Sequence, residues 1–137
     1  MILEITADLN KDESQFIRLK LDEFNRQFAG PTNFSEIGLA LRDDTKTVVG
    51  GLIGSVVWDW LHVNVLWVSD HLRGQGYGAE LLRSGERESI ERGCNFAKLH
   101  TFQFQARGFY ESLDYKVIAE TKGFPGGYSQ YLMFKAL

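Results

Sequence analysis

The chain has 137 residues, of which 44% are hydrophobic and 13% aromatic, and its formal net charge at pH 7 is −3. This length and apolar content suit one core, so we expect residues 1–137 to form a single domain. Without a run of Lys or Arg, a slightly acidic chain attracts neither nucleic acid nor an anionic membrane, and neither is an expected partner. No apolar run of about 18 residues and no basic-then-apolar leader occurs, which predicts a cytoplasmic protein without a membrane span.

Hydrophobic periodicity predicts a strand-rich α/β chain. In chain order, the predicted elements are a strand at 2–6, a helix at 12–28, strands at 37–42, 47–57 and 62–68, a helix at 76–92, a strand at 96–102, a short helix at 105–113 and strands at 115–120 and 128–137. The charged side of the helix at 76–92, which includes Arg83, is expected to face solvent. Cys94 is the only cysteine, so it cannot form an internal disulfide, and we expect it to fill the core.

Residues 66–82 run from an apolar strand through a glycine-rich turn into an amphipathic helix. The first backbone N–H groups of a helix lack partners within it, and the summed peptide dipoles place about half a positive charge there. Gly74, Gly76 and Gly78 remove side chains where a ligand approaches the main chain, and Arg73 adds a charged donor. The stretch therefore predicts a diphosphate-binding loop, although a tight strand-to-helix turn would use the same glycines.

Two other classes of glycine-rich loop, the dinucleotide-binding loop and the P-loop, fit the surrounding sequence less well. Residues 74–79 match the loose dinucleotide pattern G-x-G-x-x-A. A dinucleotide fold places that loop after its first strand, with an acidic residue about 20 positions later, whereas here several predicted strands come first and the next strand ends Thr101-Phe102-Gln103. No Gly-Lys-Ser/Thr follows, which excludes a P-loop. A nucleotide-binding function is therefore disfavoured.

Two blocks of sequence resemble the GNAT acetyltransferase superfamily. Arg73-x-x-Gly76-x-Gly78 is similar to that family's acyl-CoA loop, Gln/Arg-x-x-Gly-x-Gly/Ala, and residues 103–115 are similar to its signature Asn-x-x-Ala-x-x-Phe-Tyr-x-x-x-Gly-Phe/Tyr. Gln103 stands in place of the usual Asn, and Asp114 in place of Gly, which Asp can replace if a left-handed conformation is needed. The order of elements is similar too, so the resemblance covers essentially the whole chain. Residues 101–106 and 124–127 look like those of a group of small bacterial members with poorly assigned acceptors.

The resemblance implies an α/β fold with a mixed, mostly antiparallel twisted sheet of six to seven strands, flanked by about four helices. Its central strands, 62–68 and 96–102, would splay apart beyond a bulge, and the pantetheine arm of the implied co-substrate acetyl-CoA would lie between them. A backbone N–H near Leu66 would polarise the thioester carbonyl. No metal is expected. The implied cofactor-binding residues are Leu66, Trp67, Val68, Arg73, Gly74, Gln75, Gly76, Tyr77, Gly78, Gln103, Ala106 and Phe109.

The implied reaction is direct transfer of acetyl to a primary amine. Tyr110 matches the family tyrosine that protonates the departing thiolate, although without the motif it would read as a core aromatic. Related proteins often carry Glu on the strand before the loop, where this chain has His62 and Asn64. His62 is the candidate base and Asn64 could position a water, while His71 and His100 are weaker candidates.

The predicted acceptor is an amine on a small molecule. Its site is expected to include the aromatic elbow at 58–60, the segment around 28–34 and the turn at 124–128, with Asp59 attracting a cationic amine. The chain could act alone or as a homodimer. Because the strand at 62–68 lacks the Glu, the alternative function is a non-catalytic sensor or regulatory module that binds acyl-CoA.

Overall fold

The computed structural model describes residues 1–137, which divide into two units, residues 1–32 and 33–137. The first unit holds helix α1, Lys11–Ala29. A capping box begins this helix: Asn10 Oδ1 accepts from the N–H of Glu13 at 2.8 Å, and Glu13 Oε1 accepts from the N–H of Asn10 at 3.0 Å. The expectation of a single domain stays a prediction.

The predicted strand at 2–6 is wrong, because these residues form no regular structure. Alternation of apolar residues describes one face of a strand but does not supply the ladder partner that a strand requires. None of the helices combines the length and the apolar character that a membrane span requires.

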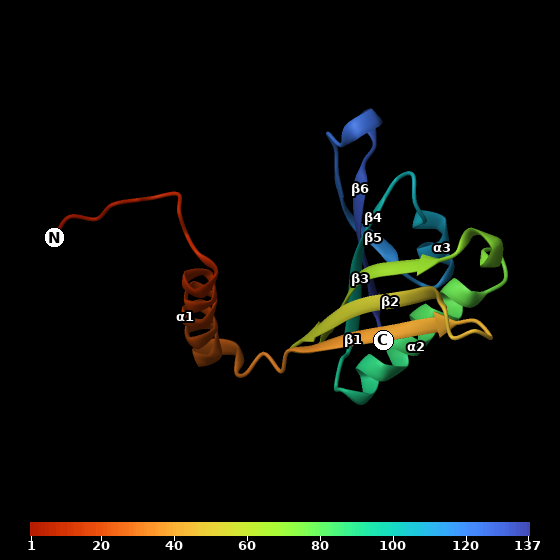
Figure 1. Cartoon of the computed structure of the whole chain (residues 1–137), viewed down its shortest axis with the longest axis horizontal. Helices are drawn as coiled ribbons and strands as arrows, with labels where there is room; N and C mark the ends of the chain where they lie inside the picture. Colours follow the sequence, from red (N-terminus) through yellow and green to blue (C-terminus); the bar gives the residue numbers. More distant parts are fainter. The chain divides into compact units, whose positions relative to one another are not determined.

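The second unit contains one sheet of six strands in the order β1-β2-β3-β4-β6-β5, with two α-helices (Figure 1). Its elements are β1 (Ser35–Arg42), β2 (Val48–Val57), β3 (Trp60–Val68), α2 (Tyr77–Glu91), β4 (Phe96–Phe102), α3 (Arg107–Ser112), β5 (Lys116–Thr121) and β6 (Gln130–Ala136), with 3₁₀ turns at Asp70–Leu72 and Pro125–Gly127. Every strand pair is antiparallel except β3 with β4. The predicted mixed sheet is therefore confirmed with six strands, and the prediction of about four helices becomes three α-helices.

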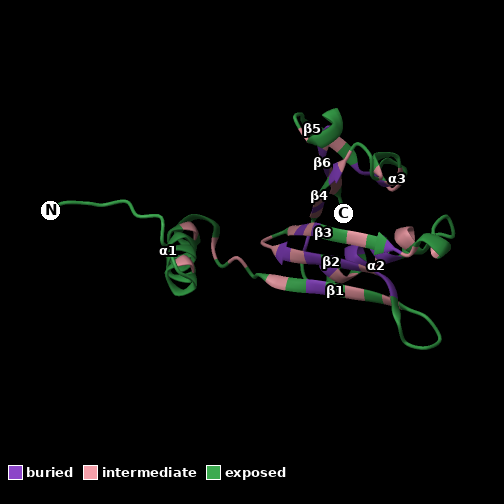
Figure 2. Ribbon diagram, turned by 45° about the horizontal axis from the view of Figure 1, so that its top comes forward, coloured by how far each residue is buried: buried purple, intermediate pink, exposed green.

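The core lies between the sheet and α2, and Figure 2 shows buried positions along β2. Leu52 and Leu82 are fully buried. A Cβ at Gly85 would come within 3.1 Å of Leu52 Cδ1, so glycine lets the helix approach the sheet. Cys94 is buried, as predicted. The buried residues of this cluster are Ile37, Leu52, Val56, Leu61, Val63, Leu82, Cys94, Ala97, Leu99, Tyr110, Tyr115, Tyr131 and Met133.

A charged side chain also lies within this core. Glu86 of α2 is only 6% exposed, and its carboxylate accepts hydrogen bonds from the Tyr115 hydroxyl at 2.7 Å and from Lys135 Nζ at 3.0 and 3.1 Å. Burial and the neighbouring Glu86 raise the pKa of Tyr115, so its phenol stays protonated and donates. These three side chains connect α2 to the start of β5 and to β6.

Strands β3 and β4 separate part-way along their length. They pair in parallel from Trp60 with Phe96 to Val63 with Leu99, and no pairing continues beyond that point. On the other side of β3, Gly54 of β2 pairs with Val63 and Ile53 pairs with Val65, so Asn64 is an extra residue that forms a bulge. The expected bulge and splayed central strands are confirmed, and the edge of β3 that faces β4 has no strand partner after Val63.

Candidate active site

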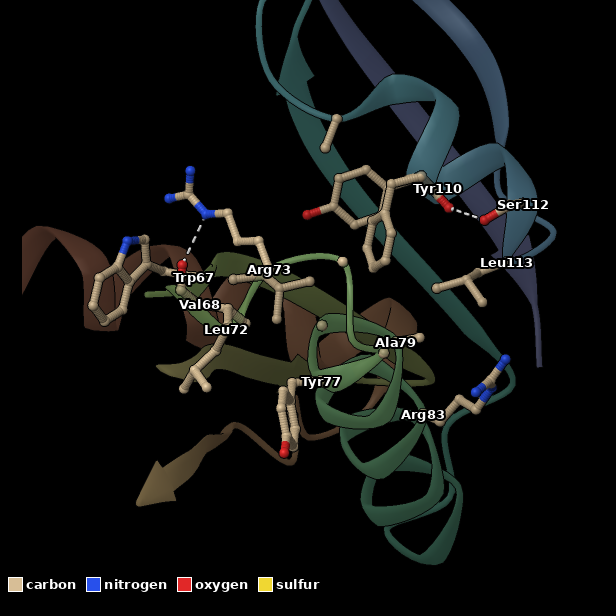
Figure 3. A pocket seen from close by; sticks show the side chains of 16 residues that line it. Trp67, Val68, Leu72, Arg73, Tyr77, Ala79, Arg83, Tyr110, Ser112 and Leu113 are labelled. Carbon is tan, nitrogen blue, oxygen red and sulfur yellow. Dashed lines mark hydrogen bonds between the residues drawn. The ribbon is translucent and has the colours of Figure 1, made fainter. Parts of the chain in front are cut away.

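A cavity of about 550 Å³ lies at the end of β3, against the N-terminus of α2 and against α3 (Figure 3). Most of the residues that the sequence assigns to the cofactor line it, and Leu72, Ala79, Arg83, Ser112 and Leu113 join them. The predicted residues at the cavity are Leu66, Trp67, Val68, Arg73, Gly74, Gly76, Tyr77, Gly78, Ala106 and Phe109.

The glycines of the loop occupy structurally different positions. Gly74 and Gly76 have φ values of +76° and +91°, a region that residues with a side chain rarely adopt. A Cβ at Gly78 would lie 3.4 Å from Phe109 Cζ, an ordinary van der Waals distance, so Gly78 marks the place where α2 and α3 come into contact. No side chain caps the N-terminus of α2. The first N–H groups of that helix therefore remain available for an anion in the cavity.

Arg73 holds the loop against the end of β3. Its Nε donates to the carbonyl of Val68 at 3.0 Å, and its guanidinium lies 2.9 Å from Asp70 Oδ1. Arg73 also lines the cavity, so it adds positive charge beside the N-terminus of α2. Part of that charge is compensated by Asp70.

Two predicted cofactor contacts are not at the cavity. Gln75 directs its amide to the carbonyl of His71 at 3.2 Å, and its side chain does not line the cavity. Gln103 Oε1 accepts from the N–H of Ser129 at 3.1 Å, and the N–H of Gln103 donates to the carbonyl of Ser129 at 2.8 Å. The amide oxygen of Gln103 therefore joins the end of β4 to the segment before β6, and its cofactor role stays a prediction.

A second cavity of about 250 Å³ opens where β3 and β4 diverge. Its polar lining residues are Asn64, His100, Thr101, Gln105 and Tyr110. Leu66, Ala106 and Tyr110 line both this cavity and the first one. The two cavities therefore meet around Tyr110, in the space that the missing β3–β4 pairing leaves.

Tyr110 is fixed by its surroundings but its hydroxyl is free. Its ring packs edge-on against Phe109 and Tyr115, with centroid distances of 5.1 and 5.9 Å. The hydroxyl makes no hydrogen bond within the protein, and Figure 3 shows it pointing away from α3 into the cavity. Burial raises the pKa of Tyr110, so the phenol is a proton donor at neutral pH.

The turn after α3 helps to hold Tyr110 in this position. Asp114 has a φ of +72°, which confirms that Asp takes the left-handed conformation in place of the usual glycine. The N–H of Tyr115 then donates to the carbonyl of Tyr110 at 3.1 Å. This backbone hydrogen bond ties the residue after the turn to the candidate acid.

His62 lines neither cavity. It lies on β3 opposite Ser55 and Lys98, and burial, followed by Lys98 and His100, lowers its pKa. The alternation of β3 places residues 62 and 64 on one face, but the bulge at Asn64 breaks that alternation. His100, whose ring centroid is 6.1 Å from that of His62, lines the second cavity instead.

The aromatic elbow at 58–60 lies at the opposite end of β3 from the first cavity, and none of its residues lines either cavity. Trp60 and Leu66 are six positions apart, or about 20 Å along a strand. Trp60 stacks on Phe96 at a centroid distance of 4.9 Å, so it packs on the sheet there. Phe124 and Tyr128 instead join Phe102 and Phe104 in a ring cluster at the end of β4.

Residues 3–115 match the model of the acetyltransferase (GNAT) family. The chain belongs to the GNAT family. A blasticidin-S acetyltransferase from Streptomyces morookaense is 40% identical over 91 residues, which cover 66% of this chain and 67% of the relative. An acetyltransferase from Agrobacterium fabrum (strain C58) is 30% identical over 128 residues, 93% of this chain and 92% of the relative.

Solved structures give the same assignment. The crystal structure of an acetyltransferase from Bacillus cereus ATCC 14579 matches with a TM-score of 0.89 and 28% identity, over 98% of each chain. This GNAT protein is therefore an acetyltransferase that depends on acetyl-CoA. The first cavity fits the coenzyme, because an uncapped helix N-terminus, a glycine loop and two arginines line it and no acidic residue does.

Proposed function

We propose that the protein transfers an acetyl group from acetyl-CoA to a primary amine on a small molecule. The coenzyme occupies the first cavity and the acceptor enters from the second. The observation that carries this proposal is that Tyr110, with an unpaired hydroxyl, lines both cavities. A proton donor at that junction can reach both the sulfur on one side and the amine on the other.

In this proposal the loop and β3 hold the coenzyme. The first N–H groups of α2, with Gly74, Gly76 and Arg73, bind the diphosphate. The unpaired edge of β3 from Leu66 to Val68 accepts the pantetheine amides as an added strand would, and the N–H of Leu66 polarises the carbonyl oxygen. The bound coenzyme supplies an acetyl thioester, whose acyl carbon accepts the amine.

Tyr110 acts as the acid. As the bond from sulfur to the acyl carbon breaks, the Tyr110 hydroxyl gives its proton to a thiolate whose conjugate acid has a pKa of about 8.5. The burial that raises the pKa of Tyr110 keeps that proton in place until the sulfur departs.

The amine must lose a proton for the same reaction, and we assign this step to the second cavity. His100 and Asn64 line it, whereas His62 does not. An imidazole can accept a proton near neutral pH, directly or through a water, while an amide can only position that water. His100 therefore replaces His62 as the proposed base, and Asn64 keeps its proposed role.

Two observations support a small acceptor. The second cavity holds about 250 Å³ and is lined mainly by polar groups, which suits part of a compact polar molecule. The relative named as a blasticidin-S acetyltransferase shares 40% identity over 91 residues.

Turnover with a broad panel of amines tests the proposal. We expect free thiol to be released from acetyl-CoA with at least one small-molecule amine and not with peptides that offer only an N-terminal amine or a lysine. Thiol release without any acceptor is the background to subtract. Calorimetric binding of acetyl-CoA with no turnover of any amine would instead favour the acyl-CoA sensor.

The pH dependence of kcat/KM should reflect deprotonation of the acceptor amine and not deprotonation of Tyr110. We expect the rate to rise from about pH 6 as the acceptor amine loses its proton, and not to fall before about pH 10, because the pKa of Tyr110 is raised above its ordinary value. Initial rates followed by thioester absorbance measure this. A decline that begins near pH 8 would mean that a group other than Tyr110 supplies the proton.

A further inference from the structure

Helix α2 brings a second arginine to the first cavity, beyond the glycine loop. Gly76, Ala79 and Arg83 are three and four residues apart, so they share one face of the helix, and all three line the cavity. Arg83 lies six residues after Tyr77, or about 9 Å along the helix axis. Figure 3 shows Arg73 and Arg83 at opposite sides of the cavity.

The charge of Arg83 is uncompensated. Its guanidinium makes no hydrogen bond or ion pair, whereas that of Arg73 is held by Val68 and Asp70. Arg87, one turn further along α2, donates to Ser84 Oγ at 3.0 Å and lies 3.6 Å from Glu80. Because no acidic residue lines the cavity, the end at Arg83 is positive in a chain whose net charge is −3. Such a site favours a second anionic group on the same ligand.

We propose that Arg83 binds the 3′-phosphate of coenzyme A. The inference rests on the proposed function, in which the diphosphate lies on the N-terminus of α2. Coenzyme A carries a further phosphate on the adenosine ribose, on the side of the diphosphate opposite to the thioester. The thioester end is assigned to Leu66 and Tyr110, so the ribose phosphate extends in the other direction, where Arg83 is the cavity's free cation. A guanidinium suits a phosphate because its planar donors reach two oxygens at once.

This assignment makes Arg83 a specificity determinant for the coenzyme and not a catalytic residue. It distinguishes coenzyme A from 3′-dephospho-coenzyme A, which has the same diphosphate, pantetheine and thiol. Its replacement should therefore change the affinity for the coenzyme, and the two ligands together show which phosphate is concerned.

Isothermal titration calorimetry with both ligands tests the inference on the full-length protein. We expect Arg83→Gln to raise the Kd of coenzyme A about tenfold and to leave the Kd of 3′-dephospho-coenzyme A unchanged. The wild-type protein should itself bind the dephospho ligand about tenfold more weakly, with a smaller dependence on salt. Arg87→Gln is the matched control, because Arg87 lies outside the cavity, and it should change neither Kd.

The alternatives give distinct results. An equal loss of affinity for both ligands would place Arg83 on the diphosphate, and no loss for either would leave it without a contact; each overturns the inference while the coenzyme site stands. If wild-type protein bound neither ligand, the proposed coenzyme site itself would fail. Thermal unfolding of each variant confirms that a changed Kd reports binding and not loss of the fold.

Discussion

Tyr110→Phe should lower kcat about 100-fold while the Kd for coenzyme A stays nearly constant. The substitution removes only the hydroxyl, which makes no hydrogen bond in the free protein, so neither the core nor the cavity loses a contact. The departing thiolate then takes its proton from water instead of from a positioned phenol. Steady-state kinetics with saturating acetyl-CoA, together with calorimetry, separate the two quantities.

Tyr115→Phe is the matched comparison for this experiment. The two rings pack against each other, but the Tyr115 hydroxyl donates to the buried carboxylate of Glu86 at 2.7 Å. Losing that hydrogen bond should lower the free energy of unfolding by about 1.5 kcal/mol and leave kcat within about threefold of wild type. Unchanged turnover by Tyr110→Phe would remove Tyr110 from the mechanism, and equal losses of kcat in both variants would indicate that packing around α3, not proton donation, had been disturbed.

The parts of the site that depend on local sequence were predictable. The loop at 73–78 needs glycines at fixed spacing before a helix, and each requirement involves residues close in the chain. The same holds for Tyr110, which a single turn of helix places four residues after Ala106, whose carbonyl accepts its N–H at 3.1 Å. Contacts between residues that are close in the chain can be predicted from the sequence alone. The structure places these residues together at the first cavity.

Features that depend on pairing between strands far apart in the chain were harder to predict from the sequence. The strand period is two, so a single inserted residue reverses which side chains face the site. His62 still pairs with Lys98, before β3 and β4 diverge, whereas His100 lies beyond that point and lines the second cavity. The apolar alternation at 2–6 had the pattern of a strand but no partner. Gln103 was assigned from its place in a motif, and only the register of β4 with β6 shows that Ser129 lies beside it.

The charged residues of α2 show what hydrophobic periodicity cannot predict. Hydrophobic periodicity separates an apolar face from a charged one but does not say which charged position meets another element. Arg83 is exposed, as predicted, but it also lines the cavity, and Glu86 lies inside the core with two partners from the far end of the chain. The position of Arg83, seven residues after Gly76, was a usable signal, because that spacing returns the chain to the face on which the loop opens.

Glu86→Leu should lower the free energy of unfolding by about 3 kcal/mol, the largest loss of stability that we expect from a single polar position. The change leaves the Lys135 ammonium, whose side chain is 19% exposed, without its anion, and the Tyr115 hydroxyl without its acceptor. We place the value at the low end of the range for broken buried ion pairs, because Lys135 can still reach water. Urea unfolding followed by tryptophan fluorescence gives the free energy and shows through the m-value whether cooperativity is retained.

The double variant Glu86→Leu/Lys135→Met distinguishes an unpaired charge from lost attraction. Replacing both partners with apolar side chains of similar size removes the stranded ammonium, so we expect more than half of the lost stability to return. If the double variant were as unstable as Glu86→Leu alone, the packing of Glu86 between α2 and the sheet, and not its charge, would hold these elements together. A loss below about 1 kcal/mol in the single variant would show that water already reaches the carboxylate, contrary to its 6% exposure.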